Sequence, residues 1–162
     1  MTKTYKTRDI VDVISYMNAA DQNRFKELPT KIRWNLKKNL EKFVPVAKRF
    51  EEFRTELITE LQQEWFTEDK TEEGTRVVTD NNGNAILNED GSEKTEVIKK
   101  IKSEYMDEFD KAVDDINKKL GEILSEEVDI DISPIDVDGY VDSMDDDSSI
   151  TFDDLNVLSV FS

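Results

Sequence analysis

Apolar residues recur at alternating three- and four-residue steps in two long stretches of the chain, over residues 30–66 and 95–124. Such spacing places the apolar side chains on one side of an α-helix and predicts two amphipathic helices. A turn-rich loop at 80–84 separates them. Because the two apolar stripes match in length, we expect a mainly α fold built on a long antiparallel helical hairpin that resembles a coiled coil.

The first stretch has a heptad pattern. Its first row of apolar residues is Leu36, Phe43, Phe50 and Leu57, and its second row is Leu40, Ala47 and Leu61, interrupted by Arg54. Pro45 lies inside this stretch. Proline removes a backbone donor and collides with the preceding helical turn, so the sequence predicts a kink or a break near residues 41–45.

The region between the two helices has a different composition. The short β-prone runs 77–79 and 85–87 flank a loop rich in Asp, Asn and Gly. This pattern predicts a small β-hairpin at about residues 75–91, at the tip of the helical pair, with a mobile loop as the alternative. The second long helix is then expected to start near Thr95.

The end of the chain alternates apolar and acidic residues. Residues 128–132 alternate strictly, which predicts a strand that needs a partner edge, either internal or from another chain. An acidic arm follows, and a capping sequence at Thr151 predicts a short final helix. We therefore divide the chain into a helical domain at 1–128, which includes the β-hairpin, and an acidic C-terminal region at 129–162.

Charge is distributed unevenly along the chain, which has a net charge of −16. Residues 1–66 hold 13 basic and 10 acidic residues, whereas residues 129–162 hold ten Asp and no basic residue. Phosphates would be repelled by such a region, so we expect no direct nucleic-acid binding by the C-terminal region. The asymmetry favours an interaction surface instead.

The composition also excludes several kinds of chemistry. The chain has neither cysteine nor histidine, so it cannot build thiolate metal sites, histidine-ligated zinc sites or Ser-His-Asp triads by itself. Asp80, Asn82 and Asn84 match the first positions of an EF-hand loop, but Ala85 stands where that loop requires glycine. No phosphate-binding glycine motif is present, and no apolar run reaches the roughly 18 residues of a membrane span. We expect no enzyme activity, no cofactor, no metal and no membrane association.

Candidate interaction residues fall into two groups. The tryptophans Trp34 and Trp65 lie near the two ends of the first long helix and serve either core packing or an interface. The others come from the acidic region, where carboxylates alternate with apolar side chains: Ile130, Ile132, Asp136, Asp138, Tyr140, Asp145, Asp146 and Asp147. This region could mimic a phosphate backbone, or it could dock on neighbouring subunits by β-addition. A basic cluster between Arg24 and Lys38 is either a nucleic-acid footprint or a solvated face that pairs with the acidic end.

The order of these elements resembles a known group of proteins. The segment ELPTKIRWNLKKNLEKF leads into the first long helix, DNNGNAIL forms the insert, EEVDIDI the strand and FDDLNVLSVF the terminal turn. Over residues 8–160 this arrangement resembles small acidic proteins of tailed bacteriophages, many of which are grouped as domains of unknown function. The resemblance implies no activity and no catalytic residue, and the Asp-rich stretch at 136–147 looks longer than is expected for that group.

Together these observations predict a non-enzymatic phage protein that acts through protein–protein contacts, as a virion or assembly component. Its partners would be other phage or host proteins, with a homo-oligomer possible, and it would be found in the host cytoplasm or the virion. The alternative is an acidic inhibitor of a host defence or nucleic-acid-binding protein that acts by DNA mimicry.

Overall fold

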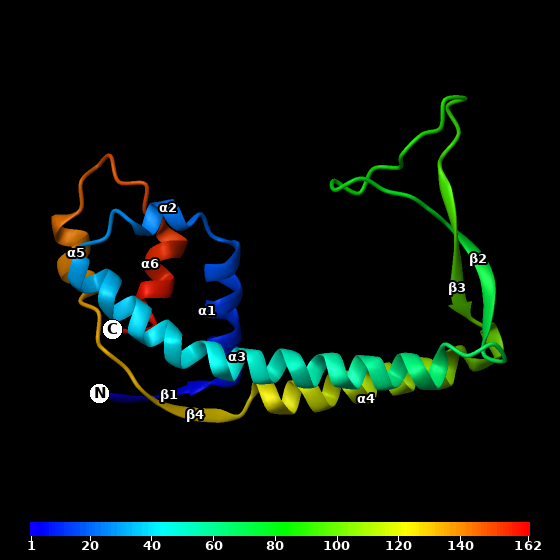
Figure 1. The fold of residues 1–162 in the computed structure, drawn as a ribbon, viewed down its shortest axis with the longest axis horizontal. Coiled ribbons are helices and arrows are strands. Elements are labelled where there is room, and N and C mark those ends of the chain that lie inside the picture. Colours follow the sequence, from blue (N-terminus) through cyan, green and yellow to red (C-terminus); the bar gives the residue numbers. More distant parts are fainter. The chain divides into compact units, whose positions relative to one another are not determined.

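The structure, a computed structural model, describes residues 1–162 and is mainly α (Figure 1). It divides into two compact units. The first unit combines Met1–Arg54 with Leu120–Ser162, and the second is Thr55–Lys119. The division differs from the predicted boundary at residues 128 and 129. The acidic C-terminal region shares a unit with the start of the chain, because both contribute apolar side chains to one core.

The elements are as follows. The helices are α1 (Thr7–Ala19), α2 (Gln22–Phe25), α3 (Thr30–Trp65), α4 (Met106–Leu124), α5 (Val137–Ser143) and α6 (Phe152–Ser159). The strands are β1 (Thr2–Lys6), β2 (Thr71–Val77), β3 (Thr95–Ile101) and β4 (Glu127–Asp131). A short 3₁₀ helix, Ser103–Tyr105, precedes α4. The predicted short final helix is confirmed as α6, with Thr151 and Asp154 forming a reciprocal capping box.

Helix α3 follows the predicted heptad pattern. The first row is buried along its whole length, from Leu36 through Phe43 and Phe50 to Leu57. Of the predicted kink or break near residues 41–45, the break is absent, because the helix continues through Pro45. Apolar burial on both sides of the proline, at Phe43 and Ala47, offsets the backbone hydrogen bond that Pro45 cannot donate.

The first unit has a core formed by both ends of the chain. Strand β1, which the sequence pattern did not reveal, pairs antiparallel with β4, so that Thr2 lies opposite Asp131 and Lys6 opposite Glu127. The alternating strand therefore has an internal partner edge. Beneath it, Phe43 contacts Tyr5 at a ring-centroid distance of 5.0 Å and Phe161 at 4.9 Å. Phe43, Phe161 and Leu158 are fully buried.

The segment that leaves β4 is attached to α3 by one buried side chain. Asn39 donates to the Ser133 carbonyl at 2.9 Å and accepts from the Ser133 N–H at 2.7 Å, and it is 0% exposed. The Asn39 amide thus satisfies the Ser133 backbone N–H and carbonyl, as a neighbouring strand would. The acidic C-terminal region is thus folded into the first unit rather than left as a free arm.

The second unit carries a longer β-hairpin than predicted. Strands β2 and β3 pair antiparallel from Thr71 opposite Ile101 to Val77 opposite Thr95. The predicted inner turn is present beyond them, with a bridge between Thr79 and Ala85. The prediction of a helix from Thr95 is wrong, since residues 95–101 are a strand and α4 begins at Met106.

Cross-strand charge explains this difference. Glu72 lies opposite Lys100, Glu73 opposite Lys99, and Arg76 opposite Glu96. Opposite charges placed directly across a strand pair stabilise it, and this complementarity is invisible to a search for helical periodicity.

Candidate protein-binding surface

An open apolar groove lies in the first unit, between the end of α1, α2 and the first half of α3. Its volume is about 620 Å³. Met17, Phe25, Leu36, Leu40 and Val44 contribute the apolar lining. Such a size and composition lie within the range of concave, mostly apolar binding sites in proteins. We call this feature the groove.

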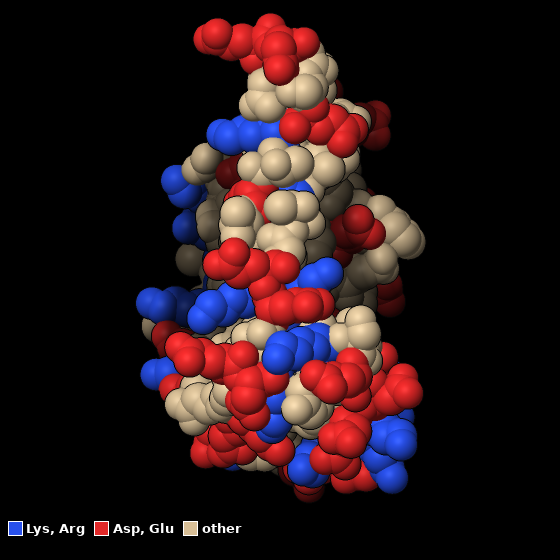
Figure 2. Space-filling view, turned by 90° about the vertical axis from the view of Figure 1, so that its right-hand side faces the viewer, with Lys and Arg blue, Asp and Glu red and all other residues tan.

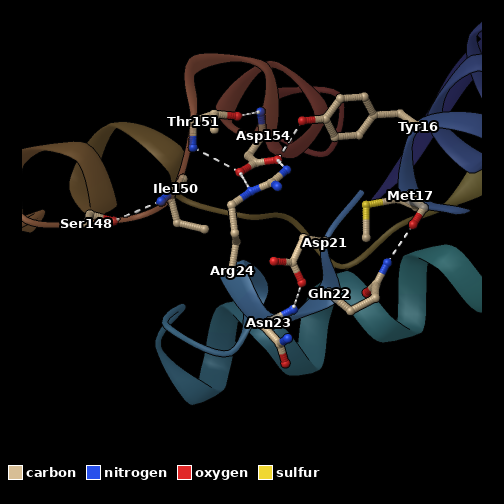
Figure 3. Close-up of polar contacts among 10 residues, drawn as sticks. All are labelled: Tyr16, Met17, Asp21, Gln22, Asn23, Arg24, Ser148, Ile150, Thr151 and Asp154. Atoms are coloured by element: carbon tan, nitrogen blue, oxygen red, sulfur yellow. Dashed lines mark hydrogen bonds and ion pairs between the residues drawn. The ribbon is translucent and has the colours of Figure 1, made fainter. Parts of the chain in front are cut away.

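One wall of the groove, α2, is only four residues long and needs outside support to stay in place. Arg24 provides it by binding the Asp154 carboxylate on α6 through two hydrogen bonds of 2.9 Å each (Figure 3). Asp21 caps α2 by accepting from the Asn23 N–H, and Gln22 donates to the Met17 carbonyl at the end of α1. These contacts fix the positions of Phe25 and of the rest of the wall.

Asp154 is the central acceptor of this network. Its side chain is 0% exposed, and it accepts from the Tyr16 hydroxyl at 2.6 Å and from the Thr151 N–H at 2.9 Å as well as from Arg24. Burial alone raises the pKa of a carboxyl group, but the hydrogen bonds from Arg24, Thr151 and Tyr16 outweigh it and hold the pKa of Asp154 well below its usual range. The buried carboxylate therefore stays ionised.

The groove has a basic rim in an otherwise acidic protein. Lys26, Arg33 and Lys37 line it, with Glu41 as the one acidic residue. None of the three basic side chains is in an ion pair. The Lys37 ammonium lies 5.9 Å from the ring centre of Trp34. The groove thus combines an apolar floor with a rim of three basic side chains and one acidic side chain, and the three basic side chains form no ion pair.

A second surface of the first unit has the opposite character. The Phe152 side chain is 76% exposed, the highest value among the large apolar residues of the chain. Asp153 follows it, and the exposed Asp145–Asp147 precede it in the same segment. Glu27 holds this segment by accepting from the Ser149 hydroxyl at 2.6 Å and the Ser149 N–H at 3.0 Å. We call residues 145–153 the acidic knob.

The two predicted tryptophans have different environments. Trp34 is 57% exposed on α3. Trp65 is 6% exposed and packs against Phe109 at a centroid distance of 5.8 Å, with the Lys70 ammonium 4.7 Å from its ring. Its indole N–H is buried without a hydrogen-bond partner. Trp34 is therefore available for an interface, whereas Trp65 serves the packing of its own unit.

The candidate residues from the acidic region also differ in their environments. Ile130, Ile132 and Tyr140 are buried in the core of the first unit, so a partner cannot reach them in the folded state. Asp136 caps α5 by accepting from the Gly139 N–H, and Asp138 is exposed in the first turn of α5. The structure brings only Asp145, Asp146 and Asp147 together, in the acidic knob.

The β2–β3 hairpin and its inner turn, residues 71–101, form a third exposed surface, which we call the arm. Val97 is 70% exposed and Leu87 60%, and Val77 and Ile86 are more than a third exposed. Figure 2 shows acidic and basic side chains intermixed on the face that it presents. The second unit holds 18 acidic and nine basic residues, so apolar side chains of this exposure stand out in it.

Sequence reasoning identified Asp145–Asp147 of the acidic knob, but it missed the groove and the exposure of Phe152. Nothing along the chain marks Met17, Phe25 and Leu40 as neighbours, because they belong to three helices. The exposure of Phe152 was also hidden, because an apolar residue beside a capping threonine is expected to pack. The one available signal was the basic cluster between Arg24 and Lys38, whose residues supply the groove rim.

No family model, curated protein or solved structure matches this chain. None of its helices combines the length and the apolar character needed to cross a membrane.

Proposed function

We propose that this chain is a non-enzymatic protein that acts through protein–protein contacts, as a virion or assembly component of a tailed bacteriophage. In this proposal it is found in the host cytoplasm during assembly and in the virion afterwards, and its partners are other phage proteins. The phage origin rests on the arrangement of elements in the sequence, and the mode of action rests on the exposed surfaces.

The observation that carries the proposal is the arm. A two-stranded sheet has two free edges and is only marginally stable by itself in water. In this arm most residues of both strands are exposed, including the apolar Val97, and only Thr71 and Ile101 are buried. A partner that adds a strand to one edge and covers these side chains would supply the missing burial.

The helical connection to the arm supports an architecture suited to that role. We propose that α3 and α4 pair as an antiparallel, coiled-coil-like hairpin that presents the arm. Within the second unit, Phe109 of α4 contacts both Trp65 and Phe66, at centroid distances of 5.8 and 6.0 Å. The stripe of α4 is half-buried, as expected of a narrow helical seam.

The absence of cysteine allows a direct test of the arm. We would place a single cysteine at Leu87, attach a photo-crosslinker and irradiate during infection by the parent phage. The expected result is a crosslink to one phage protein and recovery of the chain with purified particles. Gln63→Cys, an exposed position on α3, serves as the matched control. Recovery of Leu87 crosslinks with host proteins alone, and none with particles, would contradict an assembly role.

One observation favours a second candidate function, inhibition of a host defence or nucleic-acid-binding protein by DNA mimicry. Of the ten Asp in residues 129–162, only Asp131 and Asp154 form ion pairs. The remaining eight carboxylates form no ion pair, and Asp145–Asp147 lie adjacent to one another and are exposed.

Mimicry predicts a strong dependence on charge and salt. Changing Asp145, Asp146 and Asp147 together to Asn should abolish binding to the host target, and binding of the unchanged chain should weaken steeply as salt rises. Calorimetric titration of the target at two ionic strengths measures both effects. Equal affinity at low and high salt would rule mimicry out.

A further inference from the structure

The groove and the acidic knob are chemically complementary. The groove offers an apolar floor with three unpaired basic side chains on its rim. The acidic knob offers one large exposed aromatic side chain, Phe152, which Asp153 follows directly and which Asp145–Asp147 precede by five to seven residues. No residue of the segment 145–153 lines the groove of its own chain. Each surface therefore lacks a partner within the chain.

We propose that the groove binds the acidic knob of a second copy of this chain, with Phe152 inserted among Met17, Phe25 and Leu40. The exposed carboxylates of the acidic knob then face the basic rim, which is formed by Lys26, Arg33 and Lys37. Interface hot spots are typically large side chains that fill a well-packed, desolvated pocket near the centre of the contact. Self-association of this kind needs no phage partner, so it and the proposed function can fail independently.

Burial of Phe152 supplies the driving force. The residue is 76% exposed at the start of α6, so most of its surface is in water. The groove volume of about 620 Å³ exceeds what a single aromatic ring fills, so residues that flank Phe152 also fit. Removal of both apolar surfaces from water favours the complex.

Charge complementarity favours the acidic knob of a second copy as the occupant of the groove. A chain with a net charge of −16 repels its own copies at long range. At physiological ionic strength that repulsion is screened beyond about 8 Å, whereas pairs in direct contact are screened much less. Contact between the acidic knob and the basic rim therefore places opposite charges together in spite of the net repulsion between two copies.

Both surfaces are held in fixed positions before binding. The Arg24–Asp154 pair links α2, a wall of the groove, to α6, which begins with Phe152. Glu27, which follows α2 in the chain, accepts three hydrogen bonds from Ser148 and Ser149 in the acidic knob. Prior ordering reduces the conformational entropy lost on association.

The test is sedimentation of the full chain over a range of concentrations at physiological ionic strength. The unchanged chain should associate reversibly. Phe152→Ser, and separately Arg33→Glu with Lys37→Glu, should each weaken association by at least about tenfold. All three positions are exposed, so these variants should keep the fold, which circular dichroism and thermal unfolding would check.

Matched controls separate the groove from general charge. Lys31→Glu with Lys38→Glu makes the same charge change on the same helix outside the groove, and Val141→Ser removes another exposed apolar side chain of the acidic region. Both controls should associate like the unchanged chain. A loss in the controls equal to that in the groove variants would overturn the proposal.

Mixing provides the decisive measurement. The Phe152→Ser chain keeps its groove, and the Arg33→Glu, Lys37→Glu chain keeps its acidic knob, so an equal mixture should associate more strongly than either alone. A mixture that associates no better than its components would overturn the pairing of these two surfaces. An unchanged chain that stays monomeric at all concentrations would also overturn the proposal. This holds even if its groove binds an acidic peptide from another protein.

Discussion

At the scale of single residues, the Arg24–Asp154 pair is the one ion pair of the fold with a fully buried member. The Asp154 carboxylate has no exposed surface, and Arg24 is about a quarter exposed, with a side-chain value of 24%. Losing one member of such a pair leaves the other charge without a partner in a poorly solvated place. The pair is therefore a sensitive point for stability and for the position of α2.

Asp154→Asn should lower the free energy of unfolding by about 3 kcal/mol, at the lower end of the range for buried pairs because Arg24 keeps some solvent contact. Urea denaturation monitored by circular dichroism measures the change. The control is Asp153→Asn, at the preceding residue, which is exposed and forms no ion pair. It should change the free energy of unfolding by less than about 0.5 kcal/mol. Equal effects at the two positions would contradict the assigned role of Asp154.

The same residue predicts a pH dependence. The pKa of Asp154 is depressed in the folded state, so the unfolded chain binds its proton first as the pH falls. The stabilisation by Asp154 is complete above the unfolded pKa of about 3.9 and declines below it. The difference in unfolding free energy between the unchanged chain and Asp154→Asn should therefore narrow below about pH 4, as measured by urea titrations at several pH values.

At the scale of elements, α3 contains an internal defect at Pro45. The proline has no N–H to donate to the carbonyl of Glu41, and it is exposed at the rim of the groove. The helix persists because tertiary packing of Phe43 and Ala47 holds both sides of the defect.

Pro45→Ala should raise the free energy of unfolding by about 2 kcal/mol, because alanine restores the backbone donor and has the highest helix propensity. Thermal unfolding measures the gain. Val44→Ala, at the preceding and similarly exposed position, should shift stability by less than about 0.5 kcal/mol. A destabilised Pro45→Ala chain would mean that the packing of α3 requires the local distortion that proline imposes.

The arm depends on cross-strand charge. Lys99→Glu with Lys100→Glu would place like charges opposite Glu73 and Glu72. Each reversed pair should cost up to about 1 kcal/mol, so amide exchange in β2 and β3 should accelerate while the first unit is unaffected. Adding Glu72→Lys and Glu73→Lys should restore protection. Failure of that restoration would show that these charges do not stabilise the register.

At the scale of the whole molecule, stability is distributed unequally between the two units. The first unit contains the fully buried Phe43, Ile10, Leu158 and Phe161, whereas the arm in the second unit has few buried side chains. Segments with little buried apolar surface open at low free-energy cost.

Limited digestion with trypsin should therefore cut first within the arm, after Arg76, Lys94, Lys99 or Lys100. Mass spectrometry of early fragments identifies the sites. The basic residues of the groove rim, which are also exposed but lie on helices of the first unit, provide the internal comparison. Initial cleavage at Arg33 or Lys37 would contradict this order of stability.

Local sequence patterns determined a substantial part of this structure. The heptad row of α3, the alternating strand at β4 and the capping box of α6 were all readable, because each depends on residues within a few positions of one another. The exclusion of cysteine and histidine chemistry follows from composition in the same way.

Tertiary structure alone decided the remaining features, because they depend on residues far apart in the chain. Thr95–Ile101 could satisfy a helical stripe, and only its pairing with Thr71–Val77 made it a strand. The sequence pattern predicted residues 129–162 as a separate region. In the structure, β1 and Asn39 provide hydrogen-bond partners for the backbone of this region. The groove and the acidic knob likewise exist only where α1, α2, α3 and α6 meet. Burial and charge pairing between distant segments are therefore what placed these surfaces.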